Sequence, residues 1–467
     1  MNEKNIVDSA DVPITEVKLA ETRLPVRKKI GFGIADIGGN LFFTAMGFWT
    51  LTYLTDTVYL APALAGIAIM VAKIWDAVTD PLVGFLSDNT RSRFGRRRPY
   101  LLFGALPFGL SLWLFFTKPS FTGQTALFWW ALLMLCLVNT AMTLVNIPYS
   151  ALTPELTSDY NEQTSLNAYR FLCAGIGTMM GAVIVIPIVD MFPSKASGFS
   201  AAGAVIGGII IITTLITFFS VKESSLSCKS AGKTAASFFS AYRSVFKNSA
   251  YTVLLAVFVL HITALNFLQG MVVYYLKYIY QAEAFSSTIM GLLLITALIS
   301  IPVAAKCSNL LGKNVSYRTG LTVLCVSTMI IFFAGHRIGL IGLALLFVCA
   351  GVGVGFAFAT PWAMLPDAIA WRQDTVHNEG CYYGVWTFAA KLGQAVSTGV
   401  SGVILSIAGY RADVVQSPDT IFAIRVIAGP IAAVVCLLGC ILLHLYPIDK
   451  KTGQTHQVIF SSAPQNK

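Results

Sequence analysis

The strongest constraint on this chain is a succession of long apolar segments, each of about the length that crosses a lipid bilayer. A helix of about 20 apolar residues spans the hydrocarbon core, and about twelve such segments lie in the 467 residues. Because 56% of the residues are hydrophobic and only 12% are charged, the sequence predicts an integral membrane protein. The segments span approximately 31–55, 61–86, 100–117, 125–148, 167–190, 200–221, 250–275, 284–307, 316–334, 339–362, 380–408 and 422–446.

Positive charge is concentrated in alternate polar loops and in both terminal segments. By the positive-inside rule this places both termini and the long middle loop in the cytoplasm. The net charge of +10 therefore indicates orientation, and nucleic acid is not expected as a partner. The first thirty residues lack an apolar signal-peptide core, so the first span is expected to act as an uncleaved membrane signal. The loops on the side opposite the cytoplasm hold only five cations, Lys118, Lys195, Lys277, Arg337 and Arg411.

A polar interruption at residues 222–249 divides the apolar segments into two sets of six. Part of it, around residues 238–246, has apolar residues at helical spacing and is predicted to be an amphipathic helix on the membrane. The nine cysteines are scattered, so we expect no metal site, disulfide or cofactor. The predicted units are a cytoplasmic tail (1–29), an N-terminal bundle (30–221), a middle loop (222–249), a C-terminal bundle (250–446) and a second tail (447–467).

The two halves repeat one another weakly. Residues 147–155 read IPYSALTPE and residues 360–367 read TPWAMLPD, at the ends of the fourth and tenth segments. A polar loop follows each, and then an apolar helix with a lone cation, Arg170 or Lys391. Six plus six helices with a parallel repeat are typical of two-bundle secondary transporters, whose site lies between the halves. The predicted fold is an all-α membrane protein with twelve transmembrane helices in two six-helix bundles.

Three charged residues interrupt the second apolar segment. Lys73, Asp76 and Asp80 fall at positions i, i+3 and i+7, which share one face of a helix. Ionised side chains at membrane depth cost at least a few kcal/mol each and usually face a cavity or a partner. Two carboxylates beside an ammonium are suited to binding and releasing a small cation, and Lys73 is the candidate coupling or ion-pair residue. The structural alternatives are a buried ion pair that orients helices, or charges that extend to the cytoplasmic edge.

The loop after this segment reads GFLSDNTRSRFGRRRP over residues 84–99. Its acid and its basic cluster, Asp88 with Arg96, Arg97 and Arg98, can pair with neighbouring helix ends and hold one conformation on the cytoplasmic side. A simple positive-inside anchor is the alternative. The loop resembles the one between helices two and three of major facilitator transporters.

Several motifs together resemble the glycoside–pentoside–hexuronide:cation symporter family, the melibiose permease-like family. They are IWDAVTDP at 74–81, TRSRFG at 90–95, RP at 98–99, NIPY at 146–149, YR at 169–170 and YGVWTFAAK at 383–391, within a similarity that runs from about Lys29 to Tyr446. The resemblance implies that Asp76, Asp80 and Thr143 bind a co-transported sodium ion or proton. It also implies a cavity that binds sugar, with candidate contacts at Tyr149, Arg170, Phe358, Trp386 and Lys391. Lys391 also lies where the family has a lysine important to coupling.

Two positions depart from melibiose permease. Asn40 and Asn146 stand where that protein has acids that bind sugar hydroxyls. An amide still donates and accepts hydrogen bonds, and it does not repel an anion, so the change permits a uronide without requiring one. Asp36, one turn before Asn40, partly restores negative charge.

The sequence thus predicts cation-coupled sugar transport by alternating access, in the inner membrane of a bacterium. The expected partners are a small sugar, a monovalent cation and the lipid bilayer, and the expected state is a monomer. An exporter or exchanger on the same fold, and a lipid transporter, stay open as alternatives. An enzyme is not expected, because the sequence has no nucleophile elbow, phosphate loop or metal-ligand cluster.

Overall fold

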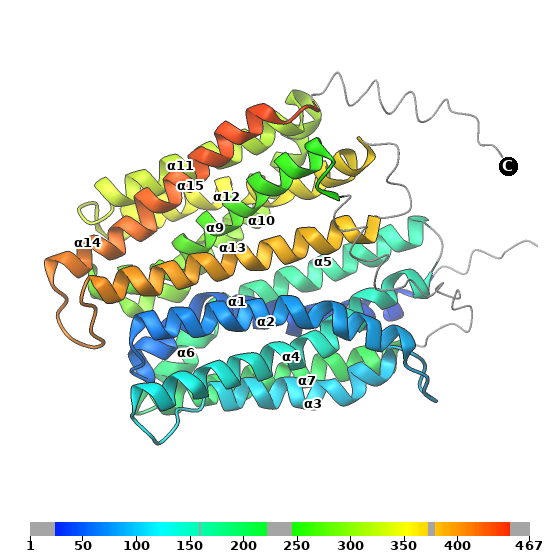
Figure 1. Cartoon of the computed structure of the whole chain (residues 1–467), viewed down its shortest axis with the longest axis horizontal. Coiled ribbons are helices and arrows are strands. Elements are labelled where there is room, and N and C mark those ends of the chain that lie inside the picture. Colours follow the sequence, from blue (N-terminus) through cyan, green and yellow to red (C-terminus); the bar gives the residue numbers. More distant parts are fainter. Residues whose placement is uncertain (1–23, 158–159, 222–244, 372–378, 449–467) are drawn as a thin grey trace, which may run out of the picture.

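The computed structural model describes residues 24–157, 160–221, 245–371 and 379–448, and all regular elements in these ranges are helices (Figure 1). Ten helical stretches among them are long and apolar enough to cross a membrane. This all-helical arrangement follows from the apolar segments, because only internal hydrogen bonds can satisfy the backbone in lipid. Most of both predicted tails, and most of the middle loop with its predicted amphipathic helix, lie outside the described residues.

The helices form two groups. The N-terminal group contains α1 (Val26–Thr52), α2 (Pro62–Asn89), α3 (Arg98–Phe115), α4 (Gln124–Leu156), α5 (Tyr160–Val183), α6 (Val185–Asp190) and α7 (Lys195–Ser220). The C-terminal group contains α9 (Ser249–Tyr278), α10 (Ser286–Leu311), α11 (Lys313–Phe333), α12 (Gly339–Ala370), α13 (Glu379–Ile407), α14 (Pro418–Val426) and α15 (Ala432–Leu442). Figure 1 shows the two groups one above the other, with their long helices running in the same general direction.

Local sequence accounts for several helix boundaries. Pro62 occupies the first turn of α2, where its missing N–H is not needed. The side chains of Ser194 and Asn248 accept hydrogen bonds from the first turns of α7 and α9. The predicted span 167–190 is interrupted at Ile184, because Pro187 has no N–H to donate to the carbonyl of Val183, four residues earlier.

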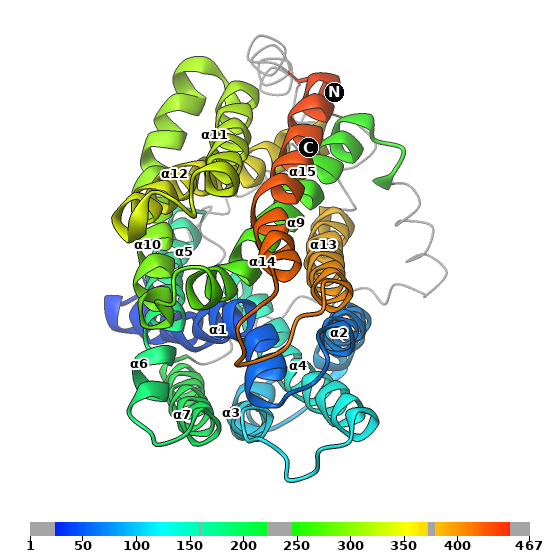
Figure 2. The same cartoon turned by 90° about the vertical axis from the view of Figure 1, so that its left-hand side faces the viewer.

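The main contacts between the groups are made by three helix pairs: α2 with α13, α5 with α10, and α1 with α9. The end-on view in Figure 2 shows α2 beside α13 and α5 beside α10. Two glycines bring α2 and α13 close together, since a Cβ added to Gly402 would lie 2.3 Å from the carbonyl oxygen of Pro62 and 2.9 Å from the Cα of Gly66. These pairs bring side chains from both groups into one site.

The molecule has a basic end and an opposite end. The basic end holds the start of α1 and the loop between α2 and α3, and the charge distribution predicts that it faces the cytoplasm. The opposite end holds the short π-helix η1 (Tyr53–Thr57), the end of α9 and the loop between α13 and α14.

Candidate functional site

Two carboxylates of α2 meet a hydroxyl of α4 near the middle of both helices. Asp76 is buried and Asp80 half-buried, and their four-residue spacing puts them on one face. Thr143 Oγ1 lies 2.9 Å from Asp76 Oδ1 and 3.2 Å from Asp80 Oδ1. Because a hydroxyl has one proton to donate, it can serve only one of the carboxylates fully at a time. The structure thus brings together the three residues predicted to bind the cation.

Lys391 of α13 places its ammonium between the other oxygen atoms of the same carboxylates. Its Nζ lies 2.7 Å from Asp76 Oδ2 and 2.5 Å from Asp80 Oδ2. The sequence placed Lys391 among the sugar contacts, whereas here it is an ion-pair partner of the acids. Since α2 and α13 belong to different groups, this ion pair joins the two halves of the protein.

Lys73 adds a second ammonium one turn before Asp76. Its side chain is half-buried and interacts electrostatically with Asp76, Asp80 and Lys391. Within the described part of the chain it forms no direct ion pair, because Lys391 occupies the carboxylate oxygens. In this conformation Lys73 therefore acts on the two carboxylates through space, and its coupling role stays a prediction.

Arg170 is held in a second polar cluster, closer to the basic end. Its Nε lies 2.8 Å from Asp36 Oδ2 and its Nη2 lies 3.3 Å from Asp36 Oδ1. Its Nη1 donates to Thr153 Oγ1 at 2.8 Å, and its guanidinium lies over the ring of Tyr149. The Tyr149 hydroxyl is itself 2.5 Å from Asp36 Oδ2. The two residues predicted to contact sugar, Arg170 and Tyr149, are thus bound to Asp36 here.

The two asparagines differ in how much hydrogen-bonding capacity remains. Asn40 Nδ2 donates to the Asp36 carbonyl at 2.9 Å, which leaves its Oδ1 and one N–H. Asn146 is half-buried and forms no side-chain hydrogen bond with the described residues. Of the predicted sugar contacts, Asn146 therefore retains the most capacity for a ligand.

The two aromatic candidates of the C-terminal group lie in different environments. Trp386 is fully buried and stacks on Phe258, with ring centroids 4.0 Å apart and planes 16° apart. Its indole offers no surface to a sugar in this conformation, contrary to the prediction. Phe358 is 49% exposed and leaves much of its ring accessible.

The basic loop pairs with helix ends of its own group. Arg97 Nη2 lies 2.8 Å from Asp88 Oδ1, and Arg96 forms an ion pair with Glu155 at the end of α4. Arg98 donates to a backbone carbonyl of α7 at 2.9 Å. These residues fasten the basic ends of α2, α3, α4 and α7 together. The sequence had not assigned a role to Glu155, although it ends the repeated motif at 147–155.

A buried acid at the opposite end connects the two groups. Asp56 of η1 is 2% exposed and accepts hydrogen bonds from Lys277, Tyr278 and Tyr410, all of the C-terminal half. Lys277 also lies 2.8 Å from Asp413 Oδ1. We call these five residues the Asp56 cluster. Sequence reasoning missed it; the only signal is an acid that ends the first apolar segment, together with a rare lysine on this side.

A second ion pair bridges the groups at the same end. Lys195 Nζ, at the start of α7, lies 2.8 Å from Glu283 Oε2 beyond the end of α9. Tyr59 also donates to Asp413 at 3.1 Å. Among the described residues, ion pairs between the groups lie at the midplane and at this end, whereas those at the basic end are within one group.

The sequence and the fold of this chain are similar to those of known transporters. A family model described as MFS/sugar transport protein matches residues 31–450. Sodium-dependent lysophosphatidylcholine symporter 1-A of Danio rerio is 29% identical over 465 residues, covering 92% of this chain and 87% of that protein. Inner membrane symporter YicJ of Escherichia coli (strain K12) is 27% identical, covering 91% and 92%. The crystal structure of nucleoside transporter NupG has a TM-score of 0.65 at 15% identity, covering 91% of this chain and all 100% of that one.

Proposed function

Because this chain belongs to the MFS/sugar transport protein family, we propose that it couples the movement of a glycoside or hexuronide to that of a sodium ion or proton. The match confirms the resemblance read from the motifs, and the protein is a multi-pass membrane symporter of the major facilitator superfamily rather than an enzyme. The choice of substrate, the cation and the site residues are the proposal.

The observation that carries the cation site is the position of Lys391. Its ammonium contacts both Asp76 and Asp80, so one positive charge satisfies the two carboxylates. A sodium ion or a proton bound there competes with the ammonium for the same oxygens. Cation binding then releases Lys391, and with it an ion pair between the two groups of helices.

The coupling follows from this exchange of charges. Leaving a buried carboxylate pair without any cation is costly, since each unpaired charge in low dielectric loses several kcal/mol of hydration. The acids are therefore occupied either by Lys391 or by the cation. The released ammonium becomes available to the cavity, where a substrate that interacts with it makes cation and substrate binding mutually favourable.

The charge of the site favours an acidic sugar. Its ion-paired and adjacent side chains comprise equal numbers of cations and carboxylates, namely Lys73, Arg170, Lys391, Asp36, Asp76 and Asp80. One bound monovalent cation makes the site positive, and a monoanionic uronide returns it to neutrality. Net charge is costly at membrane depth. The cation-loaded transporter therefore has a lower free energy with a bound uronide than with a neutral sugar.

The Asp56 cluster supports the alternating-access part of the proposal. Its contacts join the groups at the end predicted to be extracellular, so the present conformation is closed there. Opening that end requires Asp56 to leave Lys277, which keeps its second partner, Asp413, in its own group. The cluster and the Lys391 ion pair would then break during the same movement.

A lysophosphatidylcholine is the second candidate substrate, and the relatives support it. Several sodium-dependent lysophosphatidylcholine symporters are 26–29% identical to this chain over most of its length. The zwitterionic head group would leave the cation-loaded site positive, and the two asparagines would have no sugar hydroxyls to bind. We therefore place the lipid second.

Flux in the outward direction, as an exporter or exchanger, is compatible with the same site. We also propose a monomer in a bacterial inner membrane.

Thermal stability of the purified protein in the presence of ligands tests this proposal. Neutral glycosides, hexuronides and lysophosphatidylcholine are compared, each with and without sodium and at two pH values. The proposal expects a hexuronide to raise the midpoint more when the cation is present, because binding stabilises the native state. A rise with lysophosphatidylcholine alone would assign the lipid instead.

A further inference from the structure

Three consecutive cations begin α1, and they have different surroundings. Lys29 is buried, lying 2.9 Å from Glu162 Oε2 and 2.9 Å from Ser165 Oγ. Arg27 and Lys28 are exposed, and neither has an ion-pair partner within the described ranges. Two adjacent positive charges therefore stand on the outer surface at the basic end of the N-terminal group.

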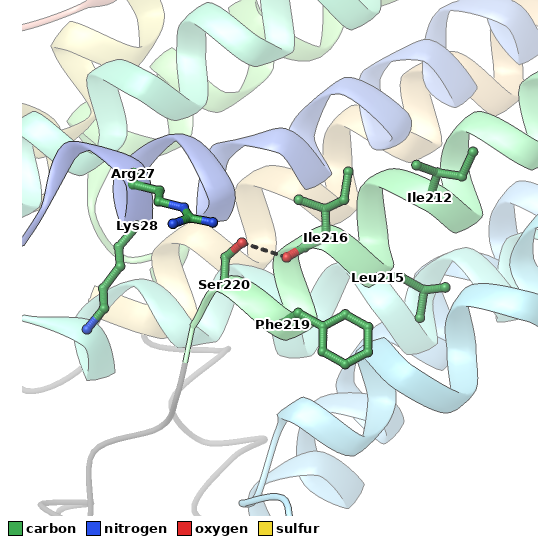
Figure 3. A pocket seen from close by; sticks show the side chains of 7 residues that line it. All are labelled: Arg27, Lys28, Ile212, Leu215, Ile216, Phe219 and Ser220. Atoms are coloured by element: carbon green, nitrogen blue, oxygen red, sulfur yellow. Dashed lines mark hydrogen bonds between the residues drawn. The ribbon is translucent and has the colours of Figure 1, made fainter.

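A groove of 630 Å³ lies beside these two charges, between the start of α1 and the last turns of α7 (Figure 3). The helices approach closely here, since a Cβ added to Gly31 would lie 2.3 Å from Ser220 Oγ. Figure 3 shows the Arg27 side chain extending toward Ser220, whose hydroxyl donates to the Ile216 carbonyl at 2.7 Å. The groove is lined by Arg27, Lys28, Ile212, Leu215, Ile216, Phe219 and Ser220.

The groove has a charged end and an apolar wall. Ile212, Ile216 and Phe219 fall at positions i, i+4 and i+7 of α7, on one face. They are 59%, 39% and 74% exposed, and they belong to a helix long and apolar enough to cross a membrane. The wall thus faces lipid, and the two cations lie at the membrane boundary where α7 ends.

We propose that this groove binds one anionic phospholipid, with its phosphate at Arg27 and Lys28 and an acyl chain along the wall of α7. The charge distribution predicts that this end faces the cytoplasm, where anionic lipids attract basic residues by about 1 kcal/mol per charge. A zwitterionic lipid fits the wall equally well but carries a cation that Arg27 and Lys28 repel. A free phosphate would use the cations and leave the wall unused.

This site is separate from the proposed cation site. A lipid bound to both helices fastens α1 to α7 within one group, at a place where Gly31 already brings them together. It is therefore expected to stabilise the N-terminal group, and it does so whatever substrate the transporter carries.

Native mass spectrometry of the full-length protein in detergent, with added phosphatidylglycerol or phosphatidylcholine of matched chains, tests the proposal. We expect phosphatidylglycerol to bind at least fivefold better than phosphatidylcholine. The double variant Arg27→Gln with Lys28→Gln should lose that preference. The charge-matched control, Arg91→Gln with Lys247→Gln, removes two other exposed cations of the basic end and should keep it.

The apolar half is tested in the same measurement. Phe219→Ala should weaken the binding of both lipids about equally, whereas glycerol phosphate, which lacks acyl chains, should not compete. If the Arg27/Lys28 variant and the control lose the preference for phosphatidylglycerol equally, the lipid is attracted diffusely to a basic surface, and the proposed site is overturned. Displacement by glycerol phosphate alone would overturn the lipid assignment in favour of a phosphate site.

Discussion

The ammonium of Lys391 lies within 2.7 Å of Asp76 and 2.5 Å of Asp80, so one side chain of the C-terminal group neutralises both acids of α2. The contact spans 311 residues of sequence. If the proposed cation binds at these acids, its affinity depends on how the two groups are arranged, because any movement that separates α2 from α13 removes the competing charge.

Replacement of Lys391 tests this competition. Lys391→Ala should abolish accumulation of substrate but preserve cation binding, and sodium affinity should rise about fivefold or more because the competing ammonium is gone. Isothermal titration calorimetry of the purified protein with sodium measures this affinity. Lys391→Arg, which keeps the charge, is the matched control and should bind sodium no better than the natural protein. Weaker sodium binding in the alanine variant would show that Lys391 supports the cation instead of competing with it.

Thr143 should contribute directly to the cation site. Thr143→Val removes the hydroxyl with little change in volume, and we expect cation affinity to fall about tenfold, since a hydrogen bond to a charged group contributes about 1.5–3 kcal/mol. The sodium dependence of initial uptake rates gives the measurement. Thr143→Ser should retain most of the affinity. Equal sodium dependence in the valine and natural proteins would remove Thr143 from the site.

The two asparagines should determine charge selectivity. Asn40→Asp and Asn146→Asp each place a carboxylate near the proposed sugar, where two unit charges 4 Å apart interact by about 4 kcal/mol at an effective dielectric constant of 20. We expect the affinity for an acidic sugar to fall at least tenfold and that for a neutral sugar to change less. Competition against a labelled sugar measures both. If neither variant discriminates, or no acidic sugar binds, a neutral glycoside becomes the better assignment.

Asp56 should stabilise the closed state of the opposite end. Asp56→Asn removes the charge that pairs with Lys277, so the open population should increase. Spin labels are placed at the exposed positions Phe121 and Val415, on loops of different groups. Electron–electron double resonance then measures the distance between the two labels. Lys313→Ala, which breaks an ion pair within the C-terminal group, is the control. An unchanged distance distribution in the Asp56 variant would exclude the cluster from gating.

The pH dependence of this cluster has a defined sign. Burial raises the pKa of Asp413, but its hydrogen bond and charge interaction with Lys277 outweigh this and hold the pKa below its usual range. A group with a lowered pKa contributes its stability above the ordinary pKa and loses it as the pH falls through the lowered one. The ionised Asp413, which pairs with Lys277 and accepts a hydrogen bond from Tyr59 of the N-terminal group, should therefore persist at neutral and mildly acidic pH. The same spin-label distances, recorded between pH 8 and pH 5, should show no opening from this group.

The sequence was sufficient for the helices and for one face of the site. Apolar length predicted about twelve spans, and ten helical stretches of the described residues are long and apolar enough to cross a membrane. The period of the helix placed Asp76 and Asp80 together. Thr143 came from the family resemblance, and the structure places it beside both acids. These features depend on local periodicity or on a motif, which is why a single chain reveals them.

Contacts between distant helices could not be predicted in this way. Helix period alone does not say which face of α13 meets α2, so Lys391 was assigned to sugar rather than to the acids. The same uncertainty in rotation left Trp386 as a candidate, although it points into the core against Phe258. Asp56 was missed because its partners come from residues more than two hundred positions away.

The central claim is that Asp76 and Asp80 bind the coupling cation. Its most direct test measures two activities of Asp76→Asn and Asp80→Asn in the same vesicle preparation: accumulation driven by a cation gradient, and exchange of internal for external sugar without one. The account predicts that both variants lose accumulation and retain some exchange, because the substitutions remove charge with little change in volume. Full accumulation in both variants would contradict the cation site, whereas loss of the protein from the membrane would mean that the acids form a structural ion pair.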